Sequence, residues 1–313
     1  MTTDASRILF APTEDGVRIA YTVIGNGPPL VCAPGWVSHV ELGAQASQMG
    51  AFARRLARHC RVVTYDGRGT GLSDRNVDDL SLRMRVKDLE AIAAQVPEER
   101  FAIFAWSQAT PVALVYAAEH PERVSELALF ASFCEAFGRD PAREPLLRAL
   151  LSLIRAEWGV GIRTTLGFTH PDADREEQRE ALRYLGQSST GEVAARILEE
   201  GMFEIDVADY VPRITAPTLV LHRRDDIAVP AEFGRKVASL LPNARFVLLE
   251  GDHHIPFDSE DDPAIRHVEE FLGIEPEAAL APPAPAKAAH EHDHDGVLHA
   301  HWHVPDSAHR HGH

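Results

Sequence analysis

The sequence predicts an α/β protein with a mostly parallel central sheet and helices on both faces. Between Val17 and Phe130, apolar runs of strand length alternate with segments of helical periodicity. The alternation stops over a mainly helical stretch from Ser132 to about Pro212 and resumes at Thr218. Hydrophobic residues make up 45% of the 313-residue chain, which is enough for the large core that such a fold needs.

The predicted strands are short apolar runs that stop at turn-forming residues. The first two flank Glu14–Gly16, whose Asp-Gly pair is a strong hairpin signal. In chain order the predicted strands are Arg7–Thr13, Val17–Ile24, Leu30–Ala33, Arg61–Tyr65, Phe101–Trp106, Val124–Phe130, Thr218–Leu221 and Arg245–Leu249.

The predicted helices carry apolar residues at helical spacing. In chain order they are Met49–Arg58, Leu80–Val96, Thr110–Ala118, Leu146–Trp158, Glu176–Leu185, Val193–Phe203, Glu232–Leu241 and Asp262–Leu272. The helical stretch over about residues 133–212 separates two strands, so we expect it to form a cap over the carboxyl edge of the sheet. Open parallel sheets bind their ligands at that edge.

The composition changes after Gly273 and predicts three parts of the chain. Residues 1–274 are expected to form the α/β domain, and residues 275–289, where prolines alternate with alanines, a semi-rigid linker. Residues 290–313 hold nine of the seventeen histidines and are expected to form a disordered tail.

Charge and cysteine content exclude several classes of protein. A formal charge of −16 argues against a nucleic-acid or anionic-membrane partner, since both need a basic surface. The three cysteines are too few for a disulfide framework, so buried reduced thiols are expected. No signal peptide and no membrane-spanning run are visible, which predicts a cytoplasmic protein. Oligomeric state is not predicted.

Ser107 is the candidate nucleophile. It stands between the predicted strand Phe101–Trp106 and the helix that follows, where a sharp turn lifts a hydroxyl clear of the backbone. The helix N-terminus beyond the turn offers N–H groups to an anionic intermediate. Ala105 and Ala109 occupy the positions two before and two after Ser107, where the usual pattern has glycine.

A serine nucleophile needs a base and an acid, and both can come from loops after later strands. In this strand–turn–helix architecture the chain order is serine, acid, histidine. The acid is Asp225 or Asp226, and we favour Asp226 because it stands three residues before Val229 of a Val-Pro pair. The base is His253 or His254, and we favour His254 because it stands three residues after Gly251. Either aspartate could instead cap the helix that follows.

Acyl transfer also needs donors for the developing oxyanion. The backbone N–H of Gln108, directly after Ser107, is one candidate, and the backbone of Trp36, in the loop after Leu30–Ala33, is the second. The glycine-rich loop Asp66–Gly71 lacks a following P-loop lysine, so it is interpreted as a tight structural loop in which Arg68 pairs with a carboxylate.

Together these residues resemble the α/β-hydrolase superfamily from about Gly16 to Leu272. The segments Tyr65–Asp74, Trp106–Gln108, His120–Val124 and Leu221–Arg224 resemble hydrolase domains found alone or fused to bacterial nucleotide cyclases and transcriptional regulators. The resemblance implies the triad Ser107, Asp226 and His254 and an oxyanion hole at Trp36 and Gln108. This chain departs from many relatives at Pro34, where they have histidine.

The predicted function is a serine hydrolase that cleaves a small apolar ester or acyl substrate through an acyl-enzyme, with no cofactor for catalysis. One alternative is a hydrolase-fold ligand sensor or binding module with little turnover. A second is an acyltransferase or perhydrolase that uses the same triad.

The histidines of the tail suggest a separate metal site. Alternating imidazoles on an extended chain can chelate Zn²⁺, Ni²⁺, Co²⁺ or Cu²⁺. The candidate ligands are His290, His292, His294, His299, His301 and His303. The alternative to a defined metal site is a disordered, solvated tail that binds metal ions only incidentally.

Overall fold

A computed structural model of the chain describes residues 7–46, 48–257, 259, 261–275, 288–294 and 297–303. The chain divides into two compact units, Met1–Ile274 and Glu275–His313. Most of the predicted linker, residues 276–287, lies outside the described residues, as do His309, His311 and His313 of the tail.

The first unit is built on an eight-stranded sheet in the order β1-β2-β4-β3-β5-β6-β7-β8. Strands β1 and β2 pair antiparallel, as do β2 and β4, and every later pair is parallel. The prediction of a mostly parallel α/β sheet is therefore confirmed. The strands are β1 (Leu9–Pro12), β2 (Arg18–Ile24), β3 (Pro29–Ala33), β4 (Arg61–Tyr65), β5 (Phe101–Trp106), β6 (Val124–Phe130), β7 (Thr218–Arg223) and β8 (Ala244–Leu249).

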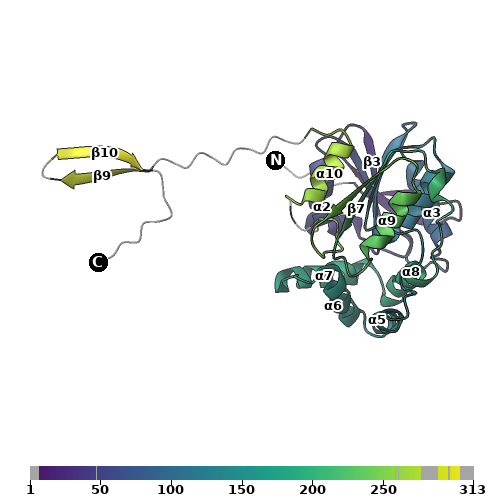
Figure 1. Ribbon diagram of the computed structural model, residues 1–313. Coiled ribbons are helices and arrows are strands. Elements are labelled where there is room, and N and C mark those ends of the chain that lie inside the picture. The colour runs from purple at the N-terminus through teal and green to yellow at the C-terminus, as the bar shows by residue number, and fades with distance from the viewer. Residues whose placement is uncertain are drawn as a thin grey trace. The chain divides into compact units, whose positions relative to one another are not determined.

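Helices cover both faces of this sheet (Figure 1). On one face α3 (Leu82–Ala93), α4 (Thr110–Glu119) and α9 (Ala231–Leu240) contribute to one hydrophobic cluster. On the other face α2 (Gln48–Leu56) and α10 (Pro263–Phe271) contribute to a second. Strand β5 divides its side chains between the two clusters with the strand period of two: Ile103 and Ala105 face the first, and Ala102 and Phe104 the second.

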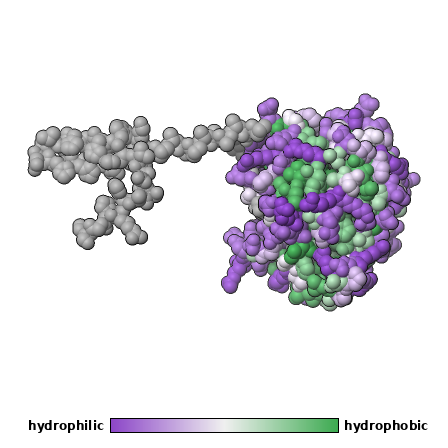
Figure 2. Space-filling model, viewed as in Figure 1, coloured by the Kyte–Doolittle hydropathy of each residue, from purple (hydrophilic) through white to green (hydrophobic). Residues whose placement is uncertain are grey.

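Four helices, which we call the helical insertion, stand between β6 and β7 and lie together at one edge of the sheet (Figure 1). They are α5 (Glu144–Ala156), α6 (Trp158–Thr169), α7 (Arg175–Ser188) and α8 (Gly191–Phe203). Figure 2 shows hydrophilic residues around hydrophobic patches on the visible face of the first unit, one of them over this insertion. The exposed side chains of Leu146 and Val160 belong to α5 and α6.

Two helices were not predicted, α1 (Val40–Ala46) and α6. Helix α6 contains three glycines and several β-branched residues, which are weak helix formers. Its stability comes from packing against α5 and α7, which the local sequence does not reveal. Within the described part of the chain, no helix is both long and apolar enough to cross a bilayer.

The second unit contains an antiparallel hairpin of β9 (Ala288–His294) and β10 (Val297–His303). These strands lie in the segment that the sequence predicted to be a disordered tail. All six candidate metal ligands lie on them, and the backbone register places His290 opposite His301 and His292 opposite His299.

Candidate active site

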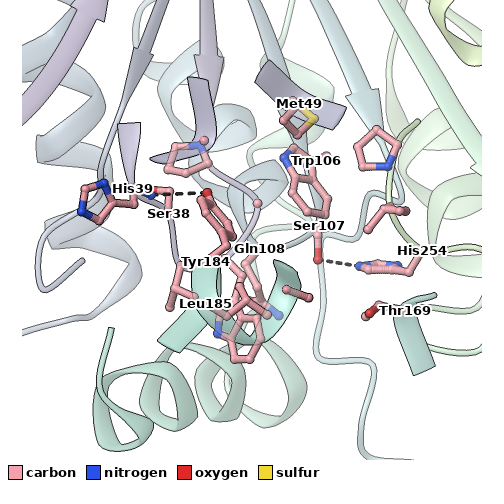
Figure 3. A pocket seen from close by; sticks show the side chains of 18 of the residues that line it. Ser38, His39, Met49, Trp106, Ser107, Gln108, Thr169, Tyr184, Leu185 and His254 are labelled. Carbon is pink, nitrogen blue, oxygen red and sulfur yellow. Dashed lines mark hydrogen bonds between the residues drawn. The ribbon is translucent and has the colours of Figure 1, made fainter. Parts of the chain in front are cut away.

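Three side chains predicted from distant segments meet at the carboxyl edge of the sheet. The Nε2 of His254 lies 2.7 Å from the Oγ of Ser107, and its Nδ1 lies 2.8 Å from Oδ2 of Asp226. Figure 3 shows the hydrogen bond between Ser107 and His254. All three side chains are buried. The structure thus forms a serine–histidine–aspartate chain of hydrogen bonds, the arrangement that activates a serine hydroxyl.

Ser107 occupies a strained turn between β5 and α4. Its φ of +49° lies in the left-handed region, which costs a residue with a Cβ about 1–2 kcal/mol. The hydroxyl of Thr110 donates to the carbonyl oxygen of Ser107 at 2.8 Å and helps to hold the turn. The backbone strain therefore lies at Ser107, whose side chain has to project from the sheet.

This strain predicts a stability difference between two variants that both lack the hydroxyl. Ser107→Gly should be about 1 kcal/mol more stable to urea than Ser107→Ala, because glycine adopts a positive φ without the Cβ penalty. Ala131, which also has a φ of +49°, provides an independent site at which replacement by glycine should stabilise. Equal unfolding free energies for the two Ser107 variants would contradict the strain argument.

The structure distinguishes the two candidate acids. Asp226 is buried, and its Oδ1 accepts hydrogen bonds from the backbone N–H groups of Ala228 at 2.9 Å and Val229 at 3.0 Å. Its other oxygen, Oδ2, faces His254. Asp225 is exposed to solvent. The carboxylate that reaches the histidine is therefore held by its own loop.

His222 is a residue of the site that the sequence analysis did not single out. The His222 side chain is buried beside Asp226. Its Nε2 lies 2.8 Å from the carbonyl oxygen of Val229 and 3.6 Å from Oδ2 of Asp226. Burial lowers the pKa of His222, so the ring is neutral and its Nε2–H donates to Val229. The ring thereby supports the loop that carries Asp226. The sequence feature that could have identified His222 is its position near the end of the strand that precedes the Asp226 loop.

The two candidate bases also differ in position. The His254 side chain is buried and its backbone N–H donates to the carbonyl oxygen of Thr169, the last residue of α6, at 2.9 Å. The helical insertion therefore helps to position this histidine. The ring of His253 instead lies 4.8 Å, between centroids, from the ring of His170.

The predicted oxyanion donors do not converge in this structure. The backbone N–H of Gln108 donates to the carbonyl oxygen of Gly35 at 2.9 Å. The Gly35–Trp36 peptide is trans, so its N–H, which belongs to Trp36, points opposite to that carbonyl. Both N–H groups were expected to face one point. The orientation of the Gly35 carbonyl cannot be predicted from residue types, because either orientation of the peptide plane is compatible with the same sequence.

Contacts from α3 and from α8 of the helical insertion surround Gln108 and Trp36. The guanidinium of Arg85 donates to the Gln108 carbonyl oxygen at 3.3 Å and pairs with Glu200 of α8. A Cβ on Gly201 would come within 2.1 Å of the Gln108 side chain, so α8 packs directly against the residue that follows Ser107. The Trp36 indole N–H donates to the carbonyl oxygen of Ala194, also in α8, at 3.0 Å.

A cavity of about 370 Å³ opens above Ser107, within the size range of small-molecule sites. Figure 3 shows Met49 and Trp106 on one side of Ser107, with Tyr184 and Leu185 on another. The helical insertion and the loop before it contribute mainly apolar side chains: Phe137, Leu147, Leu150, Leu166, Phe168, Leu185, Leu198 and Met202. The opposite wall includes Ile24, Val37, Val40, Met49, Ala53 and Phe257.

The cavity wall includes four side chains of the arginine, aspartate and glutamate types, and three of them are acids. They are Arg54, Asp66, Glu177 and Glu180. Burial raises the pKa of the Asp66 carboxyl, although Ser38 and the N–H of Leu72 donate to it at 2.8 and 2.9 Å. The Arg54 guanidinium donates to the carbonyl oxygen of Ala44.

The glycine-rich loop Asp66–Gly71 lies beside the cavity, and its Asp66 is part of the cavity wall. Its Arg68 is buried and pairs with the buried Asp88 at 2.8 Å and with the partly exposed Asp15 at 2.9 Å. The prediction that Arg68 pairs with a carboxylate is confirmed. Within this loop the backbone of Gly71 lies against the Asp66 carboxyl group. Glycine is needed there, because φ is +52° and a Cβ would lie 2.0 Å from Asp66.

Two groups of side chains in the described part of the first unit have the residue types of metal ligands. Their ligand atoms lie within 4.8 Å of one another, and the groups are Glu90, Glu119 and His120, and Asp172, Asp252 and His253. Neither group includes Ser107, Asp226 or His254.

Comparison with known proteins agrees with this geometry. A family model described as "Alpha/beta hydrolase family" matches residues 30–266. The chain belongs to the α/β-hydrolase family. This hydrolase is 29% identical over 266 residues to the pimeloyl-acyl-carrier-protein methyl ester esterase of Xanthomonas axonopodis pv. citri, covering 81% of this chain and 98% of the relative. It is 27% identical over 244 residues to the enzyme of the same name from Nitrosomonas europaea, covering 74% and 91%.

Solved structures show the same fold. An esterase from Exiguobacterium antarcticum superposes with a TM-score of 0.74 at 20% identity, covering 84% of this hydrolase and 98% of that chain. An enol-lactonase from Burkholderia xenovorans LB400 superposes with a TM-score of 0.69 at 21% identity, covering 85% and 100%. At these identities the likeness concerns the fold alone.

Proposed function

We propose that this hydrolase is a serine esterase that cleaves neutral, apolar carboxylic esters. The observation that carries the proposal is the hydrogen-bonded chain Ser107–His254–Asp226 at the base of an apolar cavity. The esterase names of its relatives support the same reaction class.

In the proposed first step the Oγ of Ser107 attacks the ester carbonyl carbon while Nε2 of His254 takes its proton. Asp226 fixes the Nδ1–H tautomer and stabilises the imidazolium that forms. Collapse of the tetrahedral intermediate breaks the bond to the alkoxy oxygen, which leaves as the alcohol with the proton from His254. Water, activated by the same nitrogen, then adds to the acyl-enzyme and releases the acid and the free serine.

The oxyanion step requires a rearrangement of the Gly35–Trp36 peptide. Rotation of this peptide plane would release the N–H of Gln108 from the Gly35 carbonyl and turn the N–H of Trp36 toward the same point. Glycine is needed at position 35, since a Cβ there would lie 2.2 Å from the Trp106 ring. One oxyanion donor contributes about 3–4 kcal/mol to transition-state stabilisation, so the rotation has a large effect on rate.

The cavity favours a neutral substrate over an anionic one. Of the four arginine, aspartate and glutamate side chains on its described wall, three are acids, and the guanidinium of Arg54 donates one hydrogen bond to the carbonyl oxygen of Ala44. A free carboxylate on the acyl chain would lose its hydration beside mainly apolar side chains and further acidic groups. An apolar acyl chain instead replaces water on the aliphatic and aromatic wall.

A matched pair of substrates tests this proposal. We expect p-nitrophenyl hexanoate to be hydrolysed with a kcat/KM at least about tenfold higher than the p-nitrophenyl monoester of adipic acid, which has the same six-carbon acyl chain with a terminal carboxylate. A Ser107→Ala control should remove turnover of both. Preference for the carboxylate ester would overturn the assignment of a neutral substrate, and absence of turnover with every ester would overturn the enzyme assignment.

One observation favours a second candidate, a ligand-binding module with little turnover. The Gln108 N–H already has a partner in Gly35, so a protein that kept this conformation with a ligand bound would lack a working oxyanion hole. A crystal structure of the Ser107 phosphonate adduct distinguishes the two functions. The esterase requires the phosphonyl oxygen to accept from Gln108, whereas the binding module retains the bond to Gly35.

A further inference from the structure

The C-terminal hairpin places histidines directly opposite one another on two strands. In the antiparallel ladder of β9 and β10, His290 pairs with His301 and His292 pairs with His299. The two strands are joined by Asp295-Gly296, a dipeptide typical of two-residue hairpin turns. Sequence and backbone register therefore agree on the same pairing.

The strand period places all the histidines of this hairpin on one face. Residues two apart share a face of a strand, and directly opposite residues share the same face of the ladder. The shared face holds His290, His292, His294, His299, His301 and His303. The acidic residues of the hairpin, Glu291 and Asp293, have the other parity and belong to the opposite face.

We propose that His290, His292, His299 and His301 form a binding site for a divalent transition metal ion of the Zn²⁺, Ni²⁺ and Cu²⁺ class. Directly opposite residues have Cβ atoms about 4.5–5.5 Å apart, so the two cross-strand pairs bring four imidazole-bearing positions into one small area. Imidazole nitrogen is the ligand that these ions favour in proteins. His294 and His303 share the face but stand opposite Val297 and Ala288, so each lacks a cross-strand histidine.

Metal binding and hairpin formation support each other in this proposal. An isolated two-stranded hairpin is marginally stable in water. A metal ion that joins both strands stabilises the paired state, because the ligands meet in register only when the strands pair. The site is independent of Ser107 and does not rest on the proposed esterase function.

The proposal is tested by titrating the full chain with ZnCl₂ in a calorimeter and comparing two double variants. His290→Ala/His301→Ala removes one cross-strand pair, whereas the matched control His294→Ala/His303→Ala removes the same number of histidines from the same strands. We expect the first variant to weaken the tightest site at least about tenfold and the control to change it less than about threefold. A triple His309→Ala/His311→Ala/His313→Ala variant should bind like the wild type.

Three outcomes would overturn the site. Equal losses in the two double variants would show that the tail chelates metal through any of its histidines. A dominant loss in the triple variant would place the ligands at the end of the chain. No detectable Zn²⁺ binding by the wild-type chain, with NiCl₂ giving the same result, would remove the site altogether.

Discussion

His254→Ala is expected to lower kcat/KM for ester hydrolysis by at least about 10⁴-fold. The ring of His254 is hydrogen-bonded to both Ser107 and Asp226, so its removal takes away the base and disconnects the acid. Because the three groups act as a unit, Ser107→Ala/His254→Ala should be no slower than either single variant. Steady-state kinetics with p-nitrophenyl hexanoate measures both effects.

His253→Ala is the matched control for this prediction. His253 is the neighbouring histidine, but its ring contacts His170 rather than Ser107. We expect its replacement to change kcat/KM less than about tenfold. A larger loss from His253→Ala than from His254→Ala would contradict the assignment of His254 as the base.

Arg68→Met is expected to destabilise the first unit by about 3–5 kcal/mol. Its guanidinium neutralises Asp88, and both side chains are almost completely buried. Burial raises the pKa of Asp88 to about 6 even beside the arginine, which shows how unfavourable the site is for an isolated carboxylate. Removing the partner leaves that charge uncompensated. Urea unfolding followed by circular dichroism measures the loss.

Two further variants identify the cause of this loss. Asp88→Asn in the Arg68→Met background should restore about 1–3 kcal/mol, because the amide needs no counter-charge. Asp15→Asn, which removes the partly exposed partner of Arg68, should cost about 1 kcal/mol or less. If Arg68→Met and Asp15→Asn lowered the free energy of unfolding equally, loss of the buried Arg68–Asp88 ion pair would not explain the destabilisation.

The parts of the molecule that depend on local sequence were predicted well. Short segments rich in apolar residues located β4 and β6 at their observed bounds, because a largely buried strand needs little beyond hydrophobicity and a turn at each end. Ser107 was identified because strand, lone serine and helix follow one another without interruption. Loop positions after later strands likewise led to Asp226 and His254, which the structure brings to Ser107.

The parts that depend on tertiary contacts were not predicted. Helix α6 is stabilised by its neighbours rather than by its own residues, and the support that His222 gives to Val229 becomes visible only when β7 and its loop are folded. The Gly35 carbonyl faces Gln108 because of the orientation of a single peptide plane, and the residue types do not determine that orientation. The pairing of histidines in the terminal hairpin could not be predicted without knowing the register of the two strands.

The central claim is that Ser107 is an activated nucleophile, and labelling with a fluorophosphonate probe tests it most directly. Mass spectrometry of the folded protein should find the phosphonyl group on Ser107, with at least about a 100-fold slower rate in His254→Ala and a nearly unchanged rate in His253→Ala. Folded wild-type protein that leaves Ser107 unlabelled, or labelling that proceeds equally fast without His254, would contradict the account.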